Sequence, residues 1–124
     1  AEVDGGFSVV GHNIANCHFK DGLNAAMSVA RAANRYFDEQ APWKQIKTDR
    51  EGAATTLYVM LQILSGLHVM LSPYLPFSSQ KLHEYLGFDG DVSAGRWHIY
   101  EVPAGRALPS PAPLFPKLEE LAAV

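Results

Sequence analysis

The sequence predicts an all-α protein, an antiparallel helical bundle with an irregular, proline-rich C-terminal tail. Over residues 7–86 apolar side chains recur at spacings of three and four, the period of a helix with one buried face. Proline and glycine interrupt that period only at a few points, where helices would end. Five of the eight prolines fall within residues 103–116, where the period is lost. We therefore expect a helical unit over residues 1–87 and an extended tail over residues 88–124 that packs back on it or on another body of the same protein.

Two helices open the predicted bundle. Phe7, Val10 and Ile14 predict a short helix over residues 7–16, with a tight turn at residues 16–18. A second helix is expected from Phe19 to Gln40, because its apolar residues form one stripe. The stripe consists of Phe19, Leu23, Ala26, Met27, Ala30, Ala33 and Phe37. Its alanines make the helix thin, so a neighbouring helix can approach closely.

Proline ends the second helix at Pro42, and Ala41 before it is expected to be extended. Trp43 should then emerge where the chain turns, followed by a short link over residues 44–48. Asp49 is a suitable N-cap for a third helix. Residues 53–71 are apolar on nearly every side, which predicts the central helix, interrupted by Gly66 and by His68.

Residues 72–76 contain two prolines and should break the central helix. Ser78 or Ser79 is expected to cap a fourth helix that ends at Gly87. Its buried side should carry Leu82, Tyr85 and Leu86. In the tail, residues 97–100 favour a short extended segment, residues 114–116 form an apolar plug that docks on a neighbouring surface, and residues 118–121 allow a last helical turn.

The charge of the chain is unevenly distributed. The net charge of −3 excludes a broad basic surface of the kind that binds nucleic acid. Half of the ten lysines and arginines nevertheless fall within residues 31–50, against three carboxylates. These five cations are Arg31, Arg35, Lys44, Lys47 and Arg50. Charge alone favours a solvated helix face for this window.

A tryptophan at a helix end among cations has the chemistry of a base-stacking platform. The aromatic face accepts an unstacked base, and the cations hold the flanking phosphates. The alternative for Trp43 is a core or hinge tryptophan, and the residues alone favour that alternative, because exposed tryptophan is uncommon.

The sequence contains no recognisable active site. Phosphate-binding glycine loops, nucleophile elbows and zinc-protease motifs are absent from it. The single cysteine, Cys17, excludes an internal disulfide and fits a reducing compartment, and the scattered histidines predict no metal site. His68 is expected to be a hydrogen-bonded helix histidine rather than a catalytic base. The acidic N-terminus predicts no signal peptide, and the apolar runs are too short to predict a membrane span.

Four segments in order resemble the anticodon-binding domain of methionyl-tRNA synthetase, a class I aminoacyl-tRNA synthetase. They are residues 32–43 (AANRYFDEQAPW), residues 19–27, residues 71–76 with 82–87, and residues 113–119. Each segment alone is a weak match, but together they cover nearly the whole chain. The resemblance implies a helical bundle that recognises the CAU anticodon loop of tRNA(Met).

The resemblance also implies roles for single residues. Trp43 would stack on an anticodon base, Pro42 would set the turn, and Asn34 and Arg35 would support the site. Arg31, Lys44, Lys47 and Arg50 are candidates for phosphate contacts. The HIGH and KMSKS motifs of the catalytic half are not in this sequence, nor is the first helix of the domain, which supplies an Asn and an Arg that read the anticodon.

The chain is thus expected to be part of a methionine-tRNA ligase with no cofactor or active site of its own. ATP with Mg would serve the catalytic half. Its partners would be tRNA(Met) and the N-terminal catalytic part, which would cover an apolar face left open by the missing helix. The whole enzyme is expected to be monomeric and cytoplasmic, without a membrane partner.

Two alternatives come from the same residues. One is a non-catalytic helical protein-interaction module that uses the plug and the alanine stripe. The other is the anticodon domain of valyl-, leucyl-, isoleucyl- or cysteinyl-tRNA synthetase. The Ala41-Pro42-Trp43 ending and residues 113–119 favour the methionyl enzyme.

Overall fold

The computed structural model describes residues 2–95, 97–105 and 107–115. Within these ranges the chain is helical, without a strand, as the sequence predicts. The helices are α1 (Glu2–Ala15), α2 (Phe19–Gln40), α3 (Pro42–Thr48), α4 (Arg50–Leu71) and α5 (Pro76–Tyr85), followed by a short 3-10 turn, η1 (Val92–Ala94).

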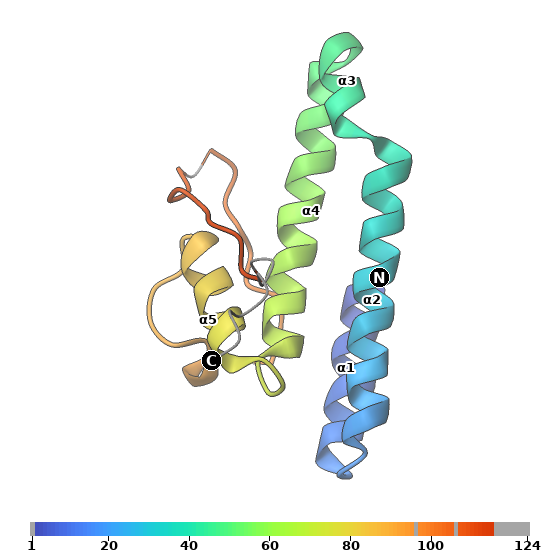
Figure 1. The fold of residues 1–124 in the computed structure, drawn as a ribbon, viewed down its shortest axis with the longest axis vertical. Coiled ribbons are helices and arrows are strands. Elements are labelled where there is room, and N and C mark those ends of the chain that lie inside the picture. Colours follow the sequence, from blue (N-terminus) through green and yellow to red (C-terminus); the bar gives the residue numbers. More distant parts are fainter. Residues whose placement is uncertain (1, 96, 106, 116–124) are drawn as a thin grey trace, which may run out of the picture.

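The two longest helices, α2 and α4, run antiparallel along the long axis of the molecule (Figure 1). The short helix α3 joins them at one end. α1 lies along the other half of α2, and α5 and the tail lie on the side of α4 that faces away from α2 (Figure 1). The α3 end of the hairpin therefore projects beyond α1 and α5.

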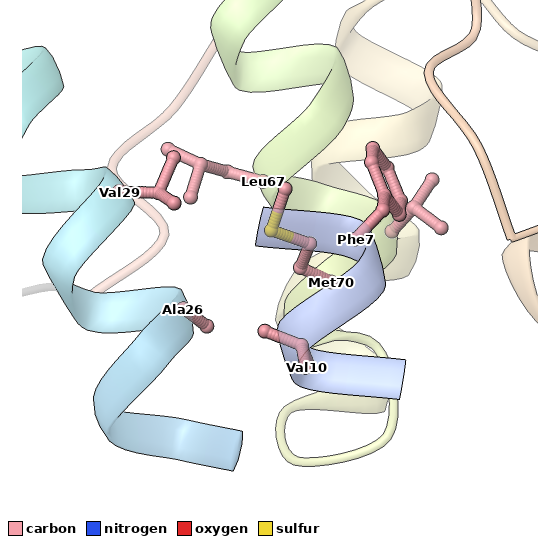
Figure 2. Packing of buried hydrophobic residues seen from close by; sticks show 7 residues of the cluster. Phe7, Val10, Ala26, Val29, Leu67 and Met70 are labelled. Atoms are coloured by element: carbon pink, nitrogen blue, oxygen red, sulfur yellow. The ribbon is translucent and has the colours of Figure 1, made fainter. Parts of the chain in front are cut away.

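The core lies where α1, α2 and α4 meet. Figure 2 shows Val10 and Phe7 of α1 facing Met70 of α4, with Ala26 and Val29 of α2 opposite. Val10, Ala26 and Met70 have no exposed surface. Gly66 permits this approach, because a Cβ there would overlap Cγ1 of Val3. The glycine that was expected to interrupt α4 instead makes room for α1, and α4 is continuous through Gly66 and His68.

The tail is held on the bundle by hydrogen bonds to two helices, α1 and α4. The Trp97 indole donates to the carbonyl of Phe7 on α1 (2.8 Å). The Gln62 amide of α4 donates to the carbonyl of Val102 (2.8 Å), and the Ser65 hydroxyl donates to the carbonyl of Tyr100. Residues 97–100 are not a strand, because their backbone meets side chains rather than another strand.

The plug predicted at residues 114–116 lies at the limit of the described chain. Leu114 lines an apolar groove with Leu61 of α4 and Leu82 of α5, whereas 68% of Phe115 is exposed. Pro116 and the helical turn expected after it lie outside the described residues.

Several local predictions are confirmed. α2 has the predicted bounds, Asp49 caps α4 by accepting a hydrogen bond from the Gly52 N–H (2.9 Å), and α4 ends before residues 72–76. Gly87, at a φ of +84°, follows the end of α5. The first helix begins at Glu2, earlier than predicted.

Other local predictions are wrong. α5 begins at Pro76, after Leu75, and neither Ser78 nor Ser79 caps it, because proline at the first helical position starts the helix earlier. Phe19 and Met27 are 55% and 41% exposed, because α1 and α4 cover a narrower stripe than the spacing indicates. The N-terminal half of α4 is also less buried than predicted, with Leu57 47% exposed.

α4 alone among the described helices is long and apolar enough to cross a membrane. A core helix passes the same test, and here polar side chains on α4 have specific roles. Gln62 and Ser65 bond the tail backbone, and His68 bonds a side chain of α5. These contacts identify α4 as the core helix of the bundle.

Candidate nucleic-acid interface

The predicted site lies at the projecting end of the hairpin, where α2 passes into α3 (Figure 1). A single residue makes this passage. Ala41 closes α2 by donating to the carbonyl of Phe37 (2.9 Å), and its own carbonyl starts α3 by accepting from the N–H groups of Lys44 and Gln45. Two helices thus share one cap residue.

Ala41 adopts the left-handed conformation, with φ 44° and ψ 64°, so the prediction of an extended residue is wrong. A residue before proline avoids the right-handed helical region, but the left-handed region also satisfies that restriction here. The conformation costs about 1–2 kcal/mol for a residue with a Cβ. It reverses the chain abruptly enough for α3 to begin at once, with the buried Pro42 as its first residue.

Trp43 is the second residue of α3 and is 49% exposed. One part of the indole contacts Phe37 of α2, with ring centroids 5.3 Å apart and planes inclined at 62°. Because this contact is edge-on, the indole is held from one side while about half of its surface faces solvent. Trp43 is therefore not a core residue, and its environment fits a stacking platform.

The orientation of α3 is fixed by a hydrogen bond to α4. Thr56, a buried residue of α4, donates its hydroxyl to the Gln45 side-chain carbonyl (3.0 Å). At 3.6 residues per turn, Trp43 and Lys47 each lie about 160° around α3 from Gln45. Both side chains therefore lie on the face that points away from α4.

Ile46, which was not predicted as a site residue, is 58% exposed. It lies three residues after Trp43, so the two are neighbours on the helix surface. Together they form an exposed apolar patch with Lys47 beside it. The spacing was visible in the sequence, but the exposure was not, because it depends on which face of α3 meets α4.

The five cations lie on three helices, α2, α3 and the start of α4. Lys44 and Lys47 are exposed on α3, and Arg50 is exposed at the start of α4. Arg35 lies six residues before Ala41, which is about 9 Å along the helix, and Arg31 lies one turn further away. Lys44, Lys47 and Arg50 thus follow Trp43 within seven residues of the chain, whereas Arg31 precedes it by twelve.

None of the five cations forms an ion pair within the part of the chain that the structure describes. Arg31 donates to the Ser28 hydroxyl (3.1 Å), a neutral partner. The nearby carboxylate of Asp49 is bound to the N–H of Gly52. Exposed guanidinium and ammonium groups in this state are available for phosphate oxygens.

Asn34 and Arg35 lie on the exposed surface of α2, away from the tip. Arg35 lines a groove of about 430 Å³ between α1 and α2, together with Val9 and Ser28. Asn34 lies one turn before Phe37, the ring that contacts Trp43. Both residues therefore lie on α2, Asn34 nine and Arg35 eight residues before Trp43 in the chain.

Among the described residues, no group of three or more His, Cys, Asp or Glu side chains converges on a point. At the end of the α2–α4 hairpin the described chain has an exposed aromatic with a supporting ring, an apolar neighbour and cations without ion pairs among the described residues. This combination is typical of a helical domain that binds nucleic acid.

Comparison with known proteins identifies the family. The family described as the anticodon binding domain of methionyl tRNA ligase matches residues 6–123, and the chain belongs to that family. A methionine–tRNA ligase of Chloroflexus aurantiacus is 42% identical over a region covering 96% of this chain and 24% of that enzyme. One from Dehalococcoides mccartyi is 47% identical over 84% of this chain and 19% of that enzyme.

A methionine–tRNA ligase from a third organism also matches nearly the whole of this chain. The methionine–tRNA ligase of Pyrococcus abyssi is 40% identical over 96% of this chain but 16% of its own length. The chain thus spans about a quarter or less of the enzymes it matches, and the match corresponds to their anticodon-binding domain.

Proposed function

We propose that this domain recognises the CAU anticodon loop of tRNA(Met), so that the catalytic part of a methionyl-tRNA ligase attaches methionine to that tRNA. The observation that carries the proposal is the half-exposed indole of Trp43 at the projecting α2–α3 turn. An anticodon base that leaves its own stack can lie on this indole, and such stacking contributes about 1–3 kcal/mol per base.

The surroundings of Trp43 suit an RNA loop. Lys44, Lys47 and Arg50 follow it on the chain and can bind phosphates on either side of the stacked base. Asn34 and Arg35 support the site from the side of α2, where a loop that reaches beyond the stacked base would lie. Arg31 is the most remote candidate for a phosphate contact. Base identity would be read by hydrogen bonds to base edges, which Trp43 alone cannot supply.

A groove next to this site fits the expected first helix of the domain. It has a volume of about 280 Å³ and is lined by apolar residues of three helices. These are Val3 of α1, Val29, Ala32, Ala33 and Tyr36 of α2, and Val59 and Ile63 of α4. α1 does not extend along this half of α2 (Figure 1). We propose that a helix preceding α1 packs here and presents the remaining anticodon-reading side chains beside Trp43.

The rest of the enzyme would supply the chemistry. Activation of methionine with ATP and Mg belongs to the catalytic part, which would be the second partner of this domain. We propose that the whole enzyme is monomeric and acts in the cytoplasm, where an exposed free thiol such as Cys17 remains reduced.

The test is tRNA binding at two salt concentrations, with tRNA(Met) and a copy whose CAU anticodon is changed. The proposal requires binding that depends on CAU and weakens with salt. If neither RNA binds, a longer chain that includes the preceding helix should restore CAU-dependent binding. Failure of the longer chain would contradict the proposal. Salt-independent association with a protein, without tRNA binding, would support an interaction module instead.

A further inference from the structure

Two buried histidines connect α4 to α5, far from the Trp43 end of the hairpin. His68 of α4 is 1% exposed and His83 of α5 is 4% exposed. Nε2 of His68 lies 3.0 Å from Nδ1 of His83, and Nε2 of His83 lies 3.0 Å from the carbonyl oxygen of Asp89. The two rings thus form a continuous chain of hydrogen bonds from α4 through α5 to the segment that follows it.

This chain fixes the protonation of both rings. The carbonyl of Asp89 can only accept, so His83 must carry a proton on Nε2. A neutral His83 then has a bare Nδ1, which must accept a hydrogen bond from the Nε2–H of His68. Neutral His68 therefore has a bare Nδ1, and this atom is buried without a hydrogen-bond partner among the described residues.

The surroundings of the pair disfavour positive charge. The rings of Phe88 and Tyr100 enclose His68, with centroids 6.0 Å and 5.9 Å away. The charged side chains on α5 and on the described residues after it up to residue 102 are all exposed: Lys81, Glu84, Asp89, Asp91 and Glu101. Tyr100 and His98 are further titratable groups in the tail. The pKa of Asp91 is lowered mainly by hydrogen bonds from the Ser93 hydroxyl and N–H and also by the charge of His83, so Asp91 attracts a proton to the pair, but from an exposed position. No buried carboxylate among the described residues compensates a cation on His68.

Protonation therefore opposes the closed arrangement. Burial lowers the pKa of His68 from 6.5 to about 4, with a smaller lowering from the nearby His83; the Ser65 and Leu64 carbonyls oppose both effects. A histidine with a lowered pKa in the folded state stabilises that state above the unfolded pKa of 6.5, and the stabilisation is lost as the pH falls towards 4. The first proton goes to the bare Nδ1 of His68, which leaves the two hydrogen bonds in place but puts a charge on a ring that is 1% exposed.

We propose that the His68–His83 pair is a proton-sensitive latch that holds α5 and residues 88–102 on α4 while both rings are neutral. When His68 takes up a proton, its buried charge reaches water only if α5 leaves α4, so the His68–His83–Asp89 chain opens and both imidazoles become solvated. α5 and residues 88–102 then separate from α4. The α2–α3–α4 hairpin keeps its structure, because its contacts with α1 and within itself do not involve the pair. The latch is independent of RNA binding and of the proposed function.

The first test measures the ring tautomers in the 124-residue chain by nitrogen NMR at pH 7.5. Both His68 and His83 should be neutral and protonated on Nε2. When the pH is lowered to 6, His68 should remain neutral. The signal of the exposed His18 in the same spectra is the reference for the signal of His68. A charged His68 at pH 6, or a proton on its Nδ1 at pH 7.5, would overturn the latch.

The second test measures amide hydrogen exchange between pH 7 and pH 4.5, corrected for the intrinsic pH dependence. Protection of α5 and residues 88–102 should fall about tenfold per pH unit for each proton taken up, whereas α2 should keep its protection. The double variant His68→Gln/His83→Gln retains polar groups that do not titrate, and its protection should not change with pH. The matched control His18→Asn, at an exposed histidine, should behave as the parent chain. Equal pH dependence in the double variant and the parent would contradict the proposal.

Discussion

The indole of Trp43 packs edge-on against the ring of Phe37, and about half of the residue is exposed to solvent. Replacement of Trp43 by alanine should weaken tRNA binding by about 1–3 kcal/mol, the usual contribution of one stacked base. The helical content should remain, because the indole is 49% exposed and its contact with Phe37 is an edge contact. Fluorescence anisotropy with labelled anticodon stem-loop RNA would measure the affinity, and far-ultraviolet circular dichroism the helicity.

The matched control for this change is Phe77→Ala. Phe77 is also an exposed aromatic, at 85%, but it lies on α5, away from α3. Its replacement should leave RNA affinity unchanged. An equal weakening in both variants would mean that Trp43 contributes only nonspecific apolar surface, and a loss of helicity in Trp43→Ala would mean that the indole is structural.

At the residue scale the sequence could predict which residues are candidates for the site, but not the contacts that surround them. The chemistry of Trp43 and its neighbouring cations is visible in the sequence, and so is the proline that precedes them. The left-handed Ala41 could not be predicted, since alanine has no intrinsic preference for that region and two adjoining helices impose it. The pairing of His68 with His83 was equally hidden, because it depends on how α5 folds back on α4.

At the scale of the element, α4 carries both the core and the support for α3. Its first turn depends on Asp49, which accepts from the Gly52 N–H at 2.9 Å. Asp49→Ala should lower the free energy of unfolding by about 0.5–2 kcal/mol, the usual cost of removing an N-cap. Urea unfolding followed by circular dichroism would measure it. Asp49→Asn, which keeps the acceptor oxygen, should restore most of that stability.

Asp38→Ala is the control for this prediction. Asp38 is a carboxylate in the middle of the same charged window, and no hydrogen bond to its side chain occurs within the described chain. The two variants remove the same charge, so a difference between them isolates the cap. Equal stability of the two would show that the Asp49–Gly52 bond does not limit the stability of α4.

Elements were predicted well where local chemistry decides them. α2 is bounded by a turn and a proline, and α4 begins at a cap, so their limits follow from the sequence. The start of α5 and the path of the tail are set by tertiary contacts such as Gln62 with Val102, which lie 40 residues apart in the chain. The exposed Phe19 and Met27 also depend on tertiary contacts. The period of the apolar residues indicates which face of α2 is buried, but not how much of that face the neighbouring helices cover.

At the scale of the whole molecule, charge separates the site from the rest of the surface. The chain carries a net charge of −3, yet Lys44, Lys47 and Arg50 are exposed around α3 without ion pairs among the described residues. The net negative charge of the chain disfavours a polyanion, whereas these three cations favour one at this end. RNA should therefore approach the hairpin tip, and its affinity should depend on where the positive charges lie rather than on their total.

The double variant Lys44→Glu/Lys47→Glu tests that dependence on position. It should weaken binding of the anticodon stem-loop and reduce the slope of log affinity against log salt by about 0.7 for each phosphate that the protein no longer neutralises. The control Lys20→Glu/Lys81→Glu changes two exposed lysines on α2 and α5 and gives the same net charge. If position decides, only the first pair flattens the salt dependence, because only those lysines release counterions from the bound RNA. Equal weakening in both variants would show that the RNA responds to net charge alone, and the tip would then have no special role in holding phosphates.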